Sequence, residues 1–238
     1  MSNFPFQRLQ SELSVLIANT PAGERLPSEP QLAKNMGVSR ATLREAMRSF
    51  EAQGMIRRRQ GAGTFVVGQV SVLESGLEIL ESLDTMAKRL NLEVTVSDLH
   101  IDRLYSDEEL SEGLKLPQAS RLVRVQRVIR ADGRPVAYLT DTLPEEYLSP
   151  ENLPDDFNGS VLDLLLARGT PLTLSRAAIS AAGATADVAR ALEIQREDVL
   201  LKFTSQLFTA DGSVVDYTVS NFIPGYFNFH IIRRIGGN

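Results

Sequence analysis

The stretch LPSEPQLAKNMGVSRATLREAMRSFEAQGMIRRRQGAGTFV, residues 26–66, decides the fold of the N-terminal part of the chain. It contains two helical patterns separated only by Gly37 and Val38, and then two short β-like segments around a glycine-rich tip. A preceding amphipathic helix is predicted over residues 5–19, because apolar residues recur there at helical spacing. This order of elements predicts a winged helix-turn-helix.

Capping residues mark where the two helices of this stretch begin. Ser28 is a suitable N-cap, and Gln31 three residues later predicts a capping box. Ser39 is the predicted cap of the second helix. Between them, Gly37 occupies a turn that requires positive φ, which glycine adopts without steric cost. The two helices are therefore predicted to meet at a tight turn.

The second helix carries polar and basic residues at its start. Arg40, Thr42 and Arg44 lie mostly off its apolar stripe, in the first turn and a half. Recognition helices present N-terminal residues to DNA bases, and arginine can donate two hydrogen bonds to guanine. Alternatively, the same residues form a solvated helix end. The choice between the two interpretations depends on the neighbouring elements.

The β-like segments predict a wing. Residues 55–59 and 64–67 read as two strands joined by a tip at Gln60–Gly63. Small glycines would let such a tip approach DNA closely. The Arg57–Arg59 run would ordinarily be a solvated face, but beside a helix-turn-helix it is predicted to meet phosphates, which steepens the salt dependence of binding.

Charge is unevenly distributed along the 238 residues. The whole chain has a net charge of −5, whereas residues 1–70 sum to +4 and the remainder to −9. A basic head on an acidic body is typical of a DNA-binding module joined to a module of another kind, although surface charge also varies between ordinary domains. The chain contains no cysteine, which excludes disulfides and thiolate metal sites.

Membrane and secretion signals are not found in the sequence. No apolar run approaches the ~20 residues that a membrane span needs. The first ten residues, MSNFPFQRLQ, lack the apolar core of a signal peptide. We therefore expect a cytoplasmic protein with no membrane partner.

The body of the chain alternates strands with short helices. An acidic helix start is predicted at residues 106–109, and an Asp-Gly turn is expected in each of two hairpins. Predicted strands cover residues 94–104, 122–129, 136–143, 172–182, 199–209 and 214–222, and predicted helices cover residues 160–168 and 185–192. This pattern predicts an α+β fold with a largely antiparallel sheet.

The head resembles the DNA-binding domain of the GntR family of bacterial transcription regulators. The resemblance is carried by LPSE, GVSRATLREA and GAGTFV in that order, with Phe50, Gly54 and Ile56 at the family's spacing. It implies base or phosphate contacts on the recognition helix and on the wing. The residues predicted to contact DNA are Ser39, Arg40, Thr42, Arg44, Arg58, Arg59, Gly61 and Gly63. One departure is Pro30, which stands where the family often has a basic residue.

The body resembles the UTRA effector-binding domain of the family's HutC branch, whose fold is similar to chorismate lyase. Matching pieces are Arg127 and Arg130 before the 131–135 turn, Leu143-Pro144, Ser160 to Gly169, the 184–192 helix, and Asp211-Gly212 leading to Asp216. The predicted division is a winged helix-turn-helix at 1–68, a linker at 69–77, and a UTRA effector-binding and dimerisation domain at 78–238.

The UTRA resemblance also implies an effector pocket. Ser82, Arg127 and Ser160 match anion-binding positions, and Asp216 and Phe222 match later pocket positions. Each has an ordinary alternative, such as a helix N-cap for the serines. The chain departs from sugar-phosphate binders at three positions, which hold Ile129, Leu139 and Leu162. We therefore expect a carboxylate, or another small metabolite with a hydrophobic part.

An enzymatic function finds little support in the sequence. His100 and His230 lie far apart, and no nucleophile elbow, Walker loop or dinucleotide fingerprint is present. No catalytic residue, cofactor or metal is predicted. We expect a homodimeric repressor that binds a pseudo-palindromic operator in double-stranded DNA and responds to a small metabolite. The alternatives are a constitutive repressor whose UTRA domain serves only dimerisation and, more remotely, an enzyme on a chorismate lyase-like fold.

Overall fold

The structure is a computed structural model that divides into two compact units, described here separately. The first unit consists mainly of residues 1–72 and the second mainly of residues 73–222. The structure describes residues 4–21, 23–52, 55–59, 62–67, 73–90 and 92–232.

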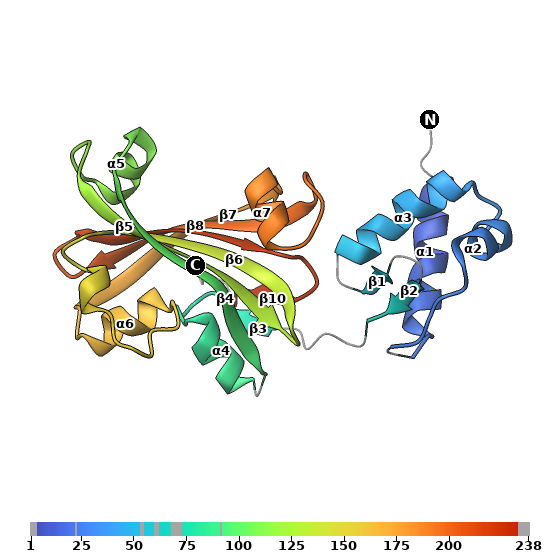
Figure 1. Cartoon of the computed structure of the whole chain (residues 1–238), viewed down its shortest axis with the longest axis horizontal. Helices are drawn as coiled ribbons and strands as arrows, with labels where there is room; N and C mark the ends of the chain where they lie inside the picture. Colours follow the sequence, from blue (N-terminus) through green and yellow to red (C-terminus); the bar gives the residue numbers. More distant parts are fainter. Residues whose placement is uncertain are drawn as a thin grey trace, which may run out of the picture. The chain divides into compact units, whose positions relative to one another are not determined.

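The first unit is a winged helix-turn-helix, as predicted (Figure 1). Its helices are α1 (Phe4–Ala18), α2 (Glu29–Asn35) and α3 (Arg40–Ala52). The wing consists of β1 (Ile56–Arg59) and β2 (Gly63–Val66), which pair antiparallel. Leu9, Leu13 and Ile17 of α1 are all buried in one apolar cluster, which also takes residues from α2, α3 and both strands. The small unit therefore has a core of its own.

Of the two predicted N-caps, Ser39 forms a capping hydrogen bond and Ser28 does not. Ser39 caps α3, because its Oγ accepts a hydrogen bond from the N–H of Thr42 at 3.0 Å. Ser28 is the N-cap residue of α2, but its side chain makes no capping hydrogen bond, so the predicted capping box is wrong. Pro30 at the second helical position has no N–H, which leaves the N–H of Gln31 at the third position as the one donor for a capping hydroxyl, and Ser28 forms no bond to it. The turn residue Gly37 has φ +66°, as predicted.

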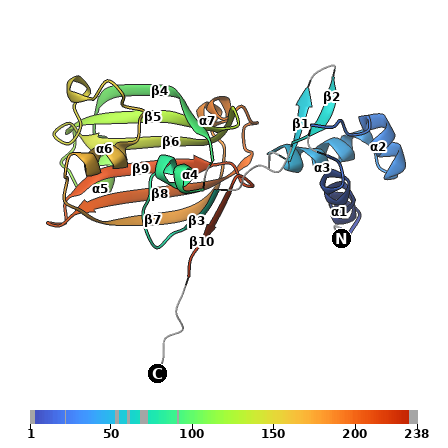
Figure 2. The same ribbon diagram turned by 90° about the horizontal axis from the view of Figure 1, so that it is seen from below.

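The second unit is built around one six-stranded antiparallel sheet, which confirms the predicted α+β class. The strands lie in the spatial order β4-β5-β6-β9-β8-β7, which Figure 2 shows face-on. Their bounds are β4 Val94–Tyr105, β5 Arg121–Ala131, β6 Arg134–Pro144, β7 Leu172–Gly183, β8 Val199–Thr209 and β9 Val214–Phe222. The β5–β6 hairpin turns at Asp132 and Gly133, which both have positive φ. This geometry matches the Asp-Gly turn predicted there.

Short helices lie on both faces of this sheet, with α4 and α6 on one face and α5 and α7 on the other (Figure 1). Their bounds are α4 Leu83–Arg89, α5 Glu108–Leu114, α6 Val161–Ala167 and α7 Ala186–Ala191, and a short 3₁₀ helix covers Pro150–Asn152. Val161 and Leu165 of α6 are fully buried against Val125 of β5. The face under α4 and α6 carries the predicted effector positions.

A separate two-stranded sheet pairs β3 (Leu73–Gly76) with β10 (Phe227–His230). The stretch predicted as linker, residues 69–77, thus contains a strand that the sequence did not indicate. The N–H of Leu77 donates to the carbonyl of His230 at 2.9 Å and continues this pairing. Residues from the two ends of the second unit therefore lie side by side.

Candidate functional site

A basic groove runs between helix α3 and the wing of the first unit. It encloses about 310 Å³. Among the described residues that line it, Glu29 alone is acidic, and the arginines are Arg25, Arg40, Arg44, Arg58 and Arg59. The fold thus brings predicted contacts from α3 and β1 into one surface, although these contacts are separated in the chain. Such a concentration of guanidinium groups suits a polyanion.

The start of α3 presents its polar side chains to solvent. Ser39, Arg40 and Thr42 are exposed, and the Arg44 side chain is 54% exposed. No carboxylate of the described residues forms an ion pair with Arg40. The hydroxyls of Ser39 and Thr42 lie 2.8 Å apart and share a hydrogen bond. Ser39 therefore shapes the helix start as well as being available at the surface.

The wing residues lie beside this helix start. Arg58 and Arg59 are exposed, and the guanidinium of Arg59 lies 5.3 Å from the ring centroid of Phe65. Stacking on an aromatic face restrains an arginine without neutralising it. Gly63 begins β2 with φ +114°. The remaining predicted wing contact, Gly61, lies outside the described residues.

Two charged residues of the groove were not among the predicted contacts, Arg25 and Glu29. Arg25 forms an isolated bridge with Phe65, and the N–H of Leu26 donates to the carbonyl of Thr64 at 2.8 Å. A Cβ on Gly63 would lie 2.3 Å from Nε of Arg25, so the guanidinium packs directly on that glycine. The sequence signal was the position of Arg25 immediately before LPSE, but its pairing with the wing depends on the fold.

The two predicted anion-binding serines converge on a carboxylate. The hydroxyls of Ser82 and Ser160 each donate to Oδ2 of Asp163 at 2.7 Å. Ser82 also caps α4, since its Oγ accepts from the N–H of Thr85 at 3.0 Å. Ser160 is the N-cap residue of α6 without a capping hydrogen bond. Asp163 therefore occupies the place between the two hydroxyls that an anion would take.

Arg127 and Asp216 meet through a residue that the sequence reasoning missed. Arg127 is ion-paired with Asp141, and both side chains are less than 10% exposed. Thr218 donates to Oδ2 of Asp216 at 2.9 Å and also contacts Asp141 at 3.2 Å. Burial raises the pKa of Asp216 well above its usual value, and the neighbouring charge of Asp141 raises it further. Burial and the neighbouring Asp141 therefore both disfavour the charged form of Asp216 within this cluster.

The predicted effector positions thus form two neighbouring polar groups and one separate aromatic residue. A Cβ on Gly159 would lie 2.7 Å from Cδ of Arg127, which places Arg127 against the residue that precedes Ser160. Phe222 lies elsewhere on β9, in edge-to-face contact with Phe203 at 5.2 Å between ring centroids and with Phe229 at 5.1 Å.

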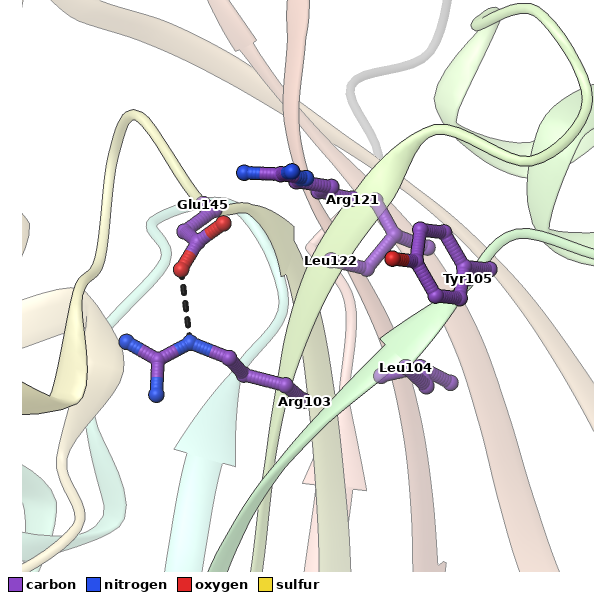
Figure 3. A pocket seen from close by; sticks show the side chains of 6 residues that line it. All are labelled: Arg103, Leu104, Tyr105, Arg121, Leu122 and Glu145. Atoms are coloured by element: carbon purple, nitrogen blue, oxygen red, sulfur yellow. Dashed lines mark hydrogen bonds and ion pairs between the residues drawn. The ribbon is translucent and has the colours of Figure 1, made fainter.

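A second pocket opens where β4 ends and β5 begins (Figure 3). It encloses about 200 Å³ and contains Arg103, Tyr105, Arg121 and Glu145. Figure 3 shows Arg103 donating to Glu145, a bond of 2.6 Å, and Arg103 is also bound by Glu151. Ligand pockets are typically larger, at roughly 300–1,000 Å³. We assign no ligand to this small pocket.

Two other kinds of feature are absent from the described residues. No cluster of three or more His, Asp or Glu side chains there could hold a metal ion. None of the described helices combines the length and apolarity needed to cross a bilayer.

Comparison with known proteins agrees with a two-unit regulator. The model for bacterial regulatory proteins of the gntR family matches residues 7–66, and the UTRA domain model matches residues 89–228. The HTH-type transcriptional regulator Rv0792c of Mycobacterium tuberculosis is 30% identical, over 89% of this chain and 78% of that protein. The histidine utilization repressor of Pseudomonas putida is 26% identical, over 76% of this chain and 72% of the repressor.

Solved structures show the same fold over nearly the whole chain. PhnF from Mycobacterium smegmatis superposes with a TM-score of 0.65 at 22% identity, over 96% of this chain and all of that one. The family models and the curated relatives define a DNA-binding transcription regulator rather than an enzyme. The chain belongs to the GntR family and carries the UTRA domain of its HutC branch.

Proposed function

We propose that this protein is a homodimeric repressor that binds a pseudo-palindromic operator and responds to a small metabolite. The observation that carries the DNA-binding part is the basic groove, where Arg40 and Arg44 of α3 lie beside Arg58 and Arg59 of the wing. A recognition helix in the major groove, with a wing on the adjacent backbone, would use these residues together.

A gel-shift or anisotropy titration tests this assignment with a duplex that the wild-type protein selects from random-sequence DNA. Replacement of both Arg40 and Arg44 by Ala should weaken binding at least tenfold, because each bidentate base contact contributes about 1–3 kcal/mol. Arg48→Ala is the matched control, since Arg48 lies on the same helix, is paired with Glu45, and does not line the groove. Unchanged affinity of the double variant would remove α3 from the interface.

The side chains on the sheet face under α4 and α6 support an effector that combines one negative charge with an apolar part. Arg127 is the buried cation there, and Asp141 already neutralises most of its charge. A dianionic phosphate is therefore poorly matched, whereas a carboxylate could replace Asp141 one for one. Leu139 and Ile129 lie on the same face of the sheet as Arg127 and are buried. These two side chains offer an apolar wall.

The edge strand β7 supports self-association. It ends the sheet order, and on its outer side it pairs with no strand in the described part of the chain. Leu174 and Ile179 on this strand are 57% and 47% exposed. The opposite edge, β4, is interrupted by a bulge between Ser97 and His100, a common protection of free edges. A second copy is the partner that would cover β7 and also provide two DNA-binding heads.

A thermal-shift screen of carboxylate metabolites tests the effector part. A ligand that binds the native state raises the melting temperature by mass action. Arg127→Lys keeps a positive charge but cannot reproduce a bidentate contact, so it should lose most of that shift while keeping DNA binding. A full shift in this variant would exclude Arg127 from the ligand site.

The second candidate is a constitutive repressor whose UTRA domain serves only dimerisation. It is favoured by one observation: Ser82 and Ser160 are satisfied by Asp163, and Arg127 by Asp141, without any ligand. Under this alternative no metabolite would shift the melting temperature or change operator affinity. Dimerisation and DNA binding would be the same under both functions.

A further inference from the structure

Glu29 places a negative charge inside the groove that carries the predicted DNA contacts. Its side chain is only 16% exposed, and it is the first residue of α2. DNA phosphates repel a carboxylate, so a groove built only to attract phosphate would hold none. Glu29 therefore requires a different physical explanation.

The two oxygens of this carboxylate hold two different arginines. Oε2 accepts a hydrogen bond from Nε of Arg44 at 2.7 Å, and Oε1 lies 3.5 Å from a terminal nitrogen of Arg58. Arg44 comes from α3 and Arg58 from β1, so one side chain of α2 connects the recognition helix with the wing. Glu29 and Arg44 are 15 positions apart in the chain.

The nitrogen that Glu29 binds decides what Arg44 can still do. A guanidinium carries five N–H groups, and the Nε–H is the one engaged here. Both terminal amino groups remain for another partner, and the Arg44 side chain is 54% exposed. Guanine presents O6 and N7 side by side to such a pair of donors. Glu29 thus restrains the stem of Arg44 without occupying its outer end.

We propose that Glu29 is a positioning residue for base reading, which orients Arg44 toward a guanine edge and ties the wing to α3. This inference rests on the proposed DNA-binding function. An unrestrained arginine loses rotamer freedom on binding, and a residue that restrains it beforehand moves this cost to folding. Pro30, the residue after Glu29, has no side-chain hydrogen-bond donor of its own. This increases the importance of the arrangement around Glu29.

Glu29→Gln separates positioning from simple electrostatics, since the two predict opposite signs. Loss of a negative charge in a DNA-binding groove would by itself strengthen binding to any duplex. Loss of positioning should weaken binding to the selected duplex by roughly three- to tenfold, the weight of one immobilised side chain. Binding to a scrambled duplex should stay equal or become tighter. Equal or tighter binding of E29Q to the selected duplex would overturn the proposal.

Glu45→Gln is the matched control. Glu45 lies on α3, its side chain is 63% exposed, and it pairs with Arg48, which does not line the groove. The variant removes one negative charge from the same unit without touching Arg44. E45Q should bind the selected duplex at least as tightly as the wild type, and a loss equal to that of E29Q would show that the loss does not require the contact with Arg44, which contradicts positioning.

A double-mutant cycle identifies the group through which Glu29 acts. In an Arg44→Ala background, Glu29→Gln should have little further effect on the selected duplex, because the arginine to be positioned is absent. Fully additive losses would mean that Glu29 does not act through Arg44, which overturns the assignment.

A DNA-free measurement covers the case in which the variants bind poorly for other reasons. In ¹H–¹⁵N spectra, the Nε–H of Arg44 should exchange slowly with solvent in the wild type and rapidly in E29Q. Equal exchange would contradict the contact. If the wild-type protein selects no sequence from random DNA, the proposed function fails, and this outcome is distinct from any result with Glu29.

Discussion

Two arginine–carboxylate pairs, one in each unit, show how the same chemistry behaves in open and in closed surroundings. Arg44 and Glu29 have side chains that are 54% and 16% exposed, whereas those of Arg127 and Asp141 are 9% and 7% exposed. Exposed pairs typically contribute about 0–1 kcal/mol and weaken in salt. Removal of one partner from a buried pair typically costs about 3–5 kcal/mol.

Because they differ in exposure to solvent, the two pairs suit different tasks. The outer end of Arg44 can take up a base or phosphate at little cost, because its contact with Glu29 is solvated. Arg127 can leave Asp141 only when another acceptor replaces the carboxylate within the same buried space. A solvated groove and a closed, buried cluster are therefore built from the same two residue types.

The largest effect should come from Asp141→Ala, which leaves Arg127 buried without its counter-ion. We expect a loss of about 3–5 kcal/mol in the free energy of unfolding of the second unit. Asp102→Ala is the control: its partner Arg124 lies on the same strand as Arg127, but that pair is 26% and 38% exposed and should contribute less than about 1 kcal/mol. Urea unfolding of both variants measures the difference, and similar losses would break the comparison.

The buried carboxyl group of Asp216 makes the stability of the second unit depend on pH. Its folded-state pKa is raised, so the native protein holds a proton that the unfolded chain releases. Stability from this group is full below about pH 4 and falls as the pH rises toward the folded-state pKa, by at most about 1.4 kcal/mol per pH unit.

Asp216→Asn keeps the shape and removes this titration. Unfolding experiments at several pH values should show a flatter profile above pH 4, with the variant gaining on the wild type as the pH rises. Parallel profiles for the two proteins would mean that Asp216 is ionised in the native state.

A substitution at Gly63 should have a smaller effect, and this effect falls on the open groove. Ala at this position would be strained at φ +114° and would meet the guanidinium of Arg25. We expect Gly63→Ala to destabilise the first unit by about 1–2 kcal/mol and to weaken DNA binding. Gly23→Ala is the matched control, because Gly23 has φ +81° but no atom within 4 Å of an added Cβ. If both variants bind DNA alike, Arg25 has no role in the groove.

The smallest effect is expected from Arg25→Ala. A phosphate-contacting arginine contributes to all sequences alike, so affinity should fall similarly for selected and scrambled duplexes. The slope of log affinity against log salt should decrease by about one. Anisotropy titrations at several salt concentrations measure this slope. A loss confined to the selected duplex would instead assign Arg25 to base reading.

Local patterns were sufficient to predict most elements of the fold. The Ser39 cap, the Gly37 turn and the Asp132-Gly133 hairpin each depend on neighbours within a few residues, and the structure has all three. The Ser28 capping box failed although Gln31 carries the N–H that the pattern uses, since the Ser28 side chain makes no capping hydrogen bond. Strand β3 was missed because its partner β10 lies about 150 residues later in the chain.

The site was less predictable, because its partners come from distant elements. Ser82 and Asp163 are 81 positions apart, and no periodicity connects them. Asp141 had left a signal: strand alternation places it on the same face as Leu139, two residues earlier, where related pockets hold Glu. The register sets Leu139 opposite Arg127 and leaves Asp141 on the diagonal. The ion pair between Arg127 and Asp141 can be predicted only when the pairing of β5 with β6 is known.

The pairing of β3 with β10 has a consequence for how such proteins diversify. Because its first and last strands are partners, a gene segment for residues 73–232 encodes a module whose two ends meet. Chain ends that lie close together are the usual condition for a domain to be transplanted or circularly permuted. Recombination upstream of β3 could therefore exchange the winged helix-turn-helix and leave the UTRA module closed.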